Sequence, residues 1–192
     1  VFFHYYLNRT IGHITVNYEK VIRKGLNQIK REIGEELAKL DFEQRECFKK
    51  MNLLKAMLIV SDAAVKFAER YADEARRLAK IEANPNRRAE LKRIAEICDH
   101  VPANPARTFH EALQSFWFTH LILNLETNSY AISPGRFDQY MYPYYKRDCE
   151  DGRLSREDAK ELLECLWVKF NELTVAKEGG TAKASITYAD FQ

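Results

Sequence analysis

The chain has 192 residues, 46% of them hydrophobic, which is enough to bury a substantial core. Its 30 Lys and Arg against 28 Asp and Glu leave a formal charge of +2, and the two signs are interspersed, which argues against a nucleic-acid-binding stripe. Only seven glycines and five prolines occur, so the composition favours long helices over many-turned β structure.

Targeting and redox signals are weak. No run of 18 uncharged apolar residues is present and the N-terminus lacks a signal-peptide pattern, so we expect no membrane association and a cytoplasmic location. The cysteines are far apart and form neither a CxxC pair nor a metal-ligand spacing. We expect each to be a buried or partly buried reduced thiol, and we expect no metal site. They are Cys47, Cys98, Cys149 and Cys165.

Both ends of the chain suggest that it is an internal piece of a longer protein. The first residue is Val1, and the aromatic segment 1–7 has no cap or polar flank, so it should pack under other material. The chain stops just after a strand-like SITYADF segment at 185–191. We therefore expect residues 1–192 to be part of one domain, truncated at both ends.

Two long helices are predicted first. Asn17 can cap a helix that starts at Tyr18, whose apolar residues recur at helical spacing as far as Leu37. This predicts an amphipathic helix on the surface. Asp41 with Gln44 predicts the start of a second helix that continues to residue 79, about 57 Å at 1.5 Å per residue.

A shorter helix and a buried helix follow. Asn84 and the proline after it predict a helix start, and Pro102 predicts the end of that helix. Thr108 and Glu111 have the spacing of a capping box. Hardly any residue of 116–125 is polar, so the helix that they begin should be buried on most of its circumference.

The last third of the chain predicts two more helices. After the SPGR turn at 133–136, aromatic residues at helical spacing predict a helix over 136–145. Arg136 and Asp138 are expected to form an ion pair that holds this turn. Ser155 with Asp158 predicts the cap of a final packing helix, whose apolar face includes Trp167. A break at residues 179–180 and a short strand should follow.

Complete catalytic motifs are absent from the sequence, which has no GxSxG elbow, HExxH helix, Walker loop or dinucleotide fingerprint. His110 is expected near the surface at a helix start. His120 lies in the apolar helix and should be a core histidine with one satisfied hydrogen bond. His13 is different, because a polar ring in the IGHIT link has no obvious packing purpose.

Three segments carry a resemblance to a known family. VPANPARTFHEALQ at 101–114, SPGRFDQYMYPYYKRD at 133–148 and CLWVKFNEL at 165–173 resemble, in this order, the pyruvate formate-lyase-like family of glycyl radical enzymes. The likeness is closer to the eliminating branch that includes the B12-independent diol dehydratases. The resemblance implies that this mainly α chain is an N-proximal helical wall portion of a ten-stranded α/β barrel.

The resemblance also implies the chemistry. In this anaerobic family a radical-SAM activase generates a glycyl radical, which forms a thiyl radical on a cysteine, and the thiyl takes a hydrogen atom from the substrate. Neither a GlyCysValGlu segment nor an ArgValSerGlyTyr-like segment occurs here, so the chain is expected to hold no catalytic residue and to be inactive alone. No directly bound cofactor is implied. The implied partners are a small-molecule substrate, the activase and further copies in a homodimer or larger homo-oligomer.

The resemblance places three residues in a substrate pocket. A GlyHis link, here ending in His13, contributes a histidine that hydrogen-bonds a substrate hydroxyl. A HisSer pair before SPGRFDQ forms the second polar wall, and here these positions are Tyr130 and Ala131. Because a site that lacks the hydroxyl partners discriminates against the substrate that needs them, glycerol and propanediol are doubtful substrates. A bulkier or less hydroxylated substrate is expected.

Three functions remain open from the sequence. The first is radical cleavage of a C–O, C–N, C–S or C–C bond by a dehydratase or lyase. The second is a formate acetyltransferase of the same family, which needs two adjacent cysteines downstream. The third is a non-catalytic helical domain that docks a partner. The reading frame beyond Gln192 would separate them.

Overall fold

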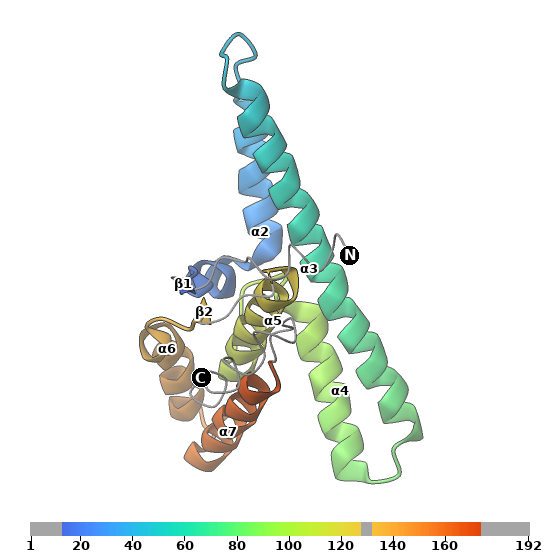
Figure 1. The fold of residues 1–192 in the computed structure, drawn as a ribbon. Coiled ribbons are helices and arrows are strands. Elements are labelled where there is room, and N and C mark those ends of the chain that lie inside the picture. Colours follow the sequence, from blue (N-terminus) through green and yellow to red (C-terminus); the bar gives the residue numbers. More distant parts are fainter. Residues whose placement is uncertain (1–12, 128–131, 174–192) are drawn as a thin grey trace, which may run out of the picture. The chain divides into compact units, whose positions relative to one another are not determined.

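The computed structural model describes residues 13–127 and 132–173, and this part of the chain is mainly helical, as predicted (Figure 1). The elements are β1 (Ile14–Thr15), α2 (Tyr18–Ala38), α3 (Cys47–Ile81), α4 (Pro85–His100), α5 (Phe109–Thr127), β2 (Ile132–Ser133), α6 (Phe137–Glu150) and α7 (Arg156–Glu172). They form two compact units. The helical unit comprises residues 19–118, and the strand unit comprises, among the described residues, 13–18, 119–127 and 132–173.

The helical unit is organised around α3, which is 35 residues and so about 52 Å long. In Figure 1, α2 runs beside the first half of α3 and α4 beside the second half. The face of α3 toward α4 is made of small residues, which let two helices approach closely. Its buried alanines are Ala64, Ala68, Ala72, Ala75 and Ala79. Cys98 of α4 and Phe118 of α5 complete this core.

The predicted start of this long helix is wrong. Asp41 forms a separate turn, in which its carboxylate accepts from the backbone N–H of Glu43 at 3.0 Å and its carbonyl from that of Gln44 at 3.2 Å. The helix begins six residues after Asp41, at Cys47. An Asp that caps its own tight turn gives the same sequence pattern as one that caps a helix.

The helix predicted over 18–37 is confirmed in its extent, but it contains a break that the sequence did not predict. The backbone of Gly25 adopts φ 70° and ψ 158°, which interrupts α2. The N–H groups of Leu26 and Asn27 donate to the carbonyls of Pro102 and Ala103 at 2.8 and 2.9 Å. A Cβ on Gly25 would lie 2.4 Å from the carbonyl carbon of Asn104, so this glycine permits a direct backbone crossing.

Three other helix starts predicted from local patterns are confirmed. The side chain of Asn84 accepts from the N–H groups of Asn86 and Arg87 at the start of α4, and Ser155 accepts from that of Asp158 at the start of α7. The hydroxyl of Thr108 likewise accepts from the N–H of the residue three positions later, at 3.2 Å. Local cap chemistry therefore determines these three boundaries.

The buried helix predicted over 116–125 is confirmed only in part. Phe116 and Phe118 are 0% and 1% exposed. His120 is also buried, but residues 121–124 are half-buried and Leu125 is 62% exposed. The apolar composition alone therefore overstates the burial of the end of α5.

In the strand unit, β1 and β2 pair in parallel with Ile14 opposite Ile132 and Thr15 opposite Ser133. α6 runs five residues past its predicted end and contains Pro143. In α7, Trp167 is 65% exposed, which contradicts its predicted place on a packing face. The packing face is instead carried by Ala159 and Leu166.

The cysteines follow the prediction with one exception. Cys47 and Cys98 are buried and Cys149 is half-buried, but Cys165 is exposed. Burial raises the pKa of the Cys98 thiol to about 12, so it stays protonated at neutral pH. Within 13–127 and 132–173, no helix is both long and apolar enough to cross a membrane. The segments predicted at 1–7 and 179–191 lie outside the described residues.

Candidate functional site

The two-stranded sheet is the centre of the candidate site. His13 comes immediately before β1, is exposed, and has φ 57°, in the left-handed region that few non-glycine residues adopt. The two strand residues that follow it pair with the two that follow Ala131 in the sequence. Tyr130 and Ala131 themselves lie outside the described residues.

The turn after β2 packs directly on β1. Gly135 has φ 68°, and a Cβ there would lie 2.7 Å from Cγ2 of Thr15. The N–H of Gly135 donates to the hydroxyl of Ser133 at 3.1 Å. The hydroxyl of Tyr140 in α6 donates to the carbonyl of Pro134 at 2.7 Å. The turn is thus held on both sides by short contacts.

The ion pair expected to hold this turn does not do so. Arg136 Nε lies 3.8 Å from Asp138 Oδ1, and both side chains are about three-quarters exposed, at 74% and 76%. An exposed pair at this distance contributes little, because water screens it. The buried Tyr140 hydroxyl, which sequence patterns did not single out for this role, holds the turn instead.

His120 is a buried core histidine, as predicted. Its Nδ1 lies 2.8 Å from the hydroxyl of Tyr18, and its ring meets that of Phe170 edge-on at 5.0 Å. Burial lowers the pKa of His120 to about 4 and raises the pKa of Tyr18. Both groups are therefore neutral near pH 7, and the tautomer of His120 decides whether the Tyr18 O–H or the Nδ1–H donates the hydrogen bond.

His110 lies at a helix start, as predicted, because it is the second residue of α5. Its side chain is half-buried, and burial followed by the nearby charge of Arg93 lowers its pKa to about 4. Next to it, the buried carboxylate of Glu111 accepts from the backbone N–H of Arg107 at 2.6 Å and from the guanidinium of the same residue at 2.6 Å. These bonds cap the N-terminal end of α5.

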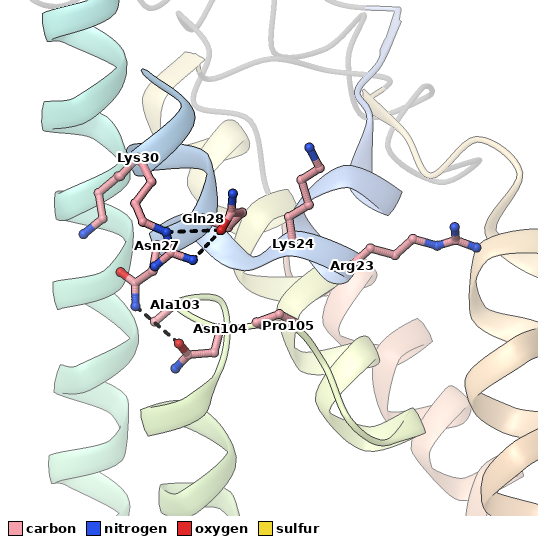
Figure 2. Close-up of a pocket in the computed structure, with 9 residues that line it drawn as sticks. Arg23, Lys24, Asn27, Gln28, Lys30, Ala103, Asn104 and Pro105 are labelled. Atoms are coloured by element: carbon pink, nitrogen blue, oxygen red, sulfur yellow. Dashed lines mark hydrogen bonds between the residues drawn. The ribbon is translucent and has the colours of Figure 1, made fainter. Parts of the chain in front are cut away.

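A hollow of about 580 Å³ in the helical unit is a second candidate site (Figure 2). Its charged lining residues are Arg23, Lys24, Lys30 and Arg31. Lys24 pairs with Glu32 at 2.6 Å and Lys30 with Asp62 at 2.8 Å. In Figure 2 the side chains of Arg23, Lys24 and Lys30 point in different directions. They do not converge on a common point, so the hollow has no built anion site.

Metal chemistry finds no support in the described ranges. Within 13–127 and 132–173, no three His, Cys, Asp or Glu side chains are grouped so that they could hold a metal ion. The strand pair with its flanking turns is therefore the arrangement with the clearest functional geometry: two short parallel strands, each preceded by a predicted pocket residue.

Comparisons with known proteins identify the family that this chain resembles. The family described as "Pyruvate formate lyase-like" matches residues 1–192. The chain is 44% identical to trans-4-hydroxy-L-proline dehydratase of Clostridioides difficile over 95% of its own length and 23% of that protein. It is 44% identical to isethionate sulfite-lyase of Oleidesulfovibrio alaskensis, covering 85% of this chain and 20% of that protein.

A solved structure is also similar to this chain. The structure describing 1,2-propanediol dehydration in Roseburia inulinivorans matches with a TM-score of 0.87 and 45% identity, over 90% of this chain and 20% of that one. The chain thus spans about a fifth of the length of the relatives that it matches.

Proposed function

Because this chain belongs to the pyruvate formate lyase-like family of glycyl radical enzymes, we propose that the full-length protein is a radical dehydratase or lyase that cleaves a C–X bond in a small organic substrate. The named relatives remove water from hydroxyproline or sulfite from isethionate. These eliminations fit the dehydratase and lyase reading better than formate acetyltransferase or a non-catalytic docking domain.

The register of the strand pair is the observation that carries the pocket proposal. Ile14 lies opposite Ile132, so the chain enters both strands from the same end. His13 precedes one strand directly and Ala131 precedes the other. Since adjacent residues are covalently joined, we propose that His13, Tyr130 and Ala131 line one substrate pocket at this end.

The residue types in the pocket suggest its selectivity. A histidine and a serine before SPGRFDQ would offer two hydrogen-bonding groups, whereas Tyr130 and Ala131 offer one phenol and one methyl group. A pocket that lacks a required hydroxyl partner rejects its substrate by a large factor. We propose a substrate that is bulkier or less hydroxylated than glycerol.

The remaining parts of the proposal concern the radical. The glycyl radical and the thiyl cysteine belong to segments that this sequence does not contain, so residues 1–192 alone should be inactive. A radical-SAM activase would install the radical, and no directly bound cofactor is required. We place the enzyme in an anaerobic cytoplasm, as a homodimer or larger homo-oligomer.

The test uses the full-length polypeptide that contains these residues, activated anaerobically by its radical-SAM partner. Electron paramagnetic resonance should show a glycyl radical. Product analysis should then show turnover with at least one of trans-4-hydroxy-L-proline, isethionate or another small hydroxylated or sulfonated acid. A protein that acquires the radical yet turns over only pyruvate would contradict the elimination chemistry.

A specificity switch tests the pocket directly. The double substitution Tyr130→His with Ala131→Ser should raise kcat/KM for propane-1,2-diol or glycerol at least about tenfold, because it restores two hydroxyl partners. His13→Ala should lower turnover of the native substrate by about 100-fold or more. Equal effects on all substrates would argue that these residues only support the fold.

A further inference from the structure

The strand pair is too short to define its own geometry. Each strand has two residues, and even a longer isolated two-stranded pair is only marginally stable in water. The pocket proposed above nevertheless requires that β1 and β2 keep one register. Other contacts must therefore hold the segments that leave the two strands.

Tyr18 anchors the segment that leaves β1. Its backbone N–H donates to the carbonyl of Val16 at 2.9 Å, and its side chain is 1% exposed. The hydroxyl reaches Nδ1 of His120 in α5 at 2.8 Å. Phe170 packs edge-on against the imidazole, which restricts the rotation of the ring. The chain three residues after Thr15 is thus tied to a fixed point.

Tyr140 anchors the segment that leaves β2 in the same way. Its side chain is 8% exposed, and its hydroxyl donates to the carbonyl of Pro134, one residue after the strand ends. Its ring lies 6.4 Å from that of Tyr18, tilted by 34°, and meets Phe137 edge-on at 5.7 Å. The two anchors therefore pack against each other, as do the two strands that they follow.

We infer that Tyr18 and Tyr140 are positioning residues for the proposed substrate pocket, and that their buried hydroxyls hold the register of the strand pair and, with it, the position of His13 directly before β1. This inference rests on the proposed function. Neither tyrosine needs to touch the substrate. Tyr18 acts through the backbone segment that follows β1. Tyr140 acts through the carbonyl of Pro134, which follows β2.

Replacement by phenylalanine separates this role from simple packing. The ring and most of its buried area remain, while the hydrogen bond to the backbone or to His120 is lost. Tyr142 supplies a matched control, because it lies in the same helix as Tyr140 and is 58% exposed. Tyr142→Phe should change neither the strand pair nor turnover.

The experiment compares Tyr18→Phe, Tyr140→Phe and Tyr142→Phe in the full-length polypeptide. The first readout is amide hydrogen exchange of residues 14–16 and 132–135, which needs no substrate. We expect exchange there to become at least about tenfold faster in Tyr18→Phe and Tyr140→Phe and to stay unchanged in Tyr142→Phe. If Tyr140→Phe fails to fold, Tyr18→Phe carries both readouts.

The second readout is turnover by the activated enzyme. Since small misplacements in a site can cost about 100-fold, we expect kcat/KM to fall about 10- to 100-fold at an unchanged glycyl radical content. Adding Tyr140→Phe to His13→Ala should cost little more than His13→Ala alone, because both act on the same group.

The outcomes distinguish the inference from the proposed function. If exchange in Tyr18→Phe and Tyr140→Phe equals that in Tyr142→Phe, the positioning role is wrong, whatever the enzyme does. If exchange accelerates but turnover is unaffected, the anchors hold the strands without serving the pocket, and the inference is again overturned. If the unsubstituted protein eliminates nothing while exchange responds as expected, the proposed function fails and the anchoring remains.

Discussion

The two units of this protein hold their interiors together in different ways. The helical unit relies on small side chains and backbone contact: a row of alanines on α3, and a crossing in which Gly25 meets the backbone of Asn104. The strand unit relies on large rings with polar ends, and the hydroxyls of Tyr18 and Tyr140 link secondary-structure elements.

This difference determines which changes each unit tolerates. Where two backbone segments are in contact, an added methyl group destabilises the fold, because the backbone atoms cannot move apart. Where hydroxyls hold the chain, the loss of one oxygen matters although the packing volume is kept. The pocket proposed above belongs to the second kind of structure, so substitutions that conserve shape can still alter it.

The largest expected loss of stability comes from a substitution in the core of the helical unit. Phe118 is 1% exposed and meets the rings of Phe67 and Tyr71 edge-on at 6.2 and 5.7 Å. Phe118→Ala should lower the free energy of unfolding of the full-length protein by about 4 kcal/mol. Chemical denaturation measures it. Phe48→Ala is the control, because Phe48 is 59% exposed, and a comparable loss in both variants would contradict the assignment of this core.

The backbone crossing should be almost as sensitive. Gly25→Ala combines a positive φ with a Cβ placed 2.4 Å from a backbone carbon, which should cost about 3 kcal/mol or more. Gly34→Ala in the same helix is the control, since a Cβ there meets nothing within 4 Å. It should instead stabilise by up to about 1 kcal/mol. Thermal melts that shift in the same direction for both variants would show that the crossing is not needed.

The two enclosed histidines permit one comparison across both units. Burial lowers the pKa of His110 and of His120 from 6.5 to about 4, so between these values the unfolded state binds more protons than the folded state. Stability is therefore lost as the pH falls through this window. Each histidine should contribute about 2 kcal/mol of loss between roughly pH 6.5 and 5.

Replacement of either histidine by glutamine should remove the contribution of that histidine to the pH dependence of stability. His110→Gln reports on the helical unit and His120→Gln on the strand unit, and denaturation midpoints across this pH range measure both. His120→Gln should also destabilise at pH 7, because it disturbs the contact with Tyr18. Curves of unchanged slope would mean that the ring in question is hydrated and titrates normally.

Substitution of a helix cap should give the smallest loss of stability, and the loss should be the same in both units. Asn84→Ala at the start of α4 and Ser155→Ala at the start of α7 each remove a side-chain acceptor from backbone N–H groups, at a cost of about 1 kcal/mol. Asn86→Ala, exposed in the first turn of α4, is a suitable control. A clear difference between the two cap variants would show that tertiary contacts outweigh the local bonds.

Features that depend on nearby residues could be predicted from the sequence. The caps at Asn84, Thr108 and Ser155 were correct, because a cap involves only the next three residues. The break at Gly25 was not predicted, because its cause lies at Asn104, far along the chain. Helical spacing continues across the break, so the pattern alone predicts one helix.

The candidate site shows the same limit. Strands of two residues have no periodicity to recognise, so the pairing of Ile14 with Ile132 could not be predicted. The place of His13 in a pocket stays a prediction, made because a polar ring in the IGHIT link has no obvious packing purpose. The prediction that Trp167 lies on the packing face was wrong, because regular apolar spacing does not define the width of the buried face of a helix.

The crossing at Gly25 has a consequence for biosynthesis. Its hydrogen bonds join residues 22–27 to residues 102–106, so they close a loop of almost 80 residues, and Asn27 and Asn104 are 77 positions apart. While the ribosome is still translating the α3 and α4 codons, the partner backbone does not yet exist. The first turns of α2 must therefore stay without these partners until the later segment emerges from the ribosome.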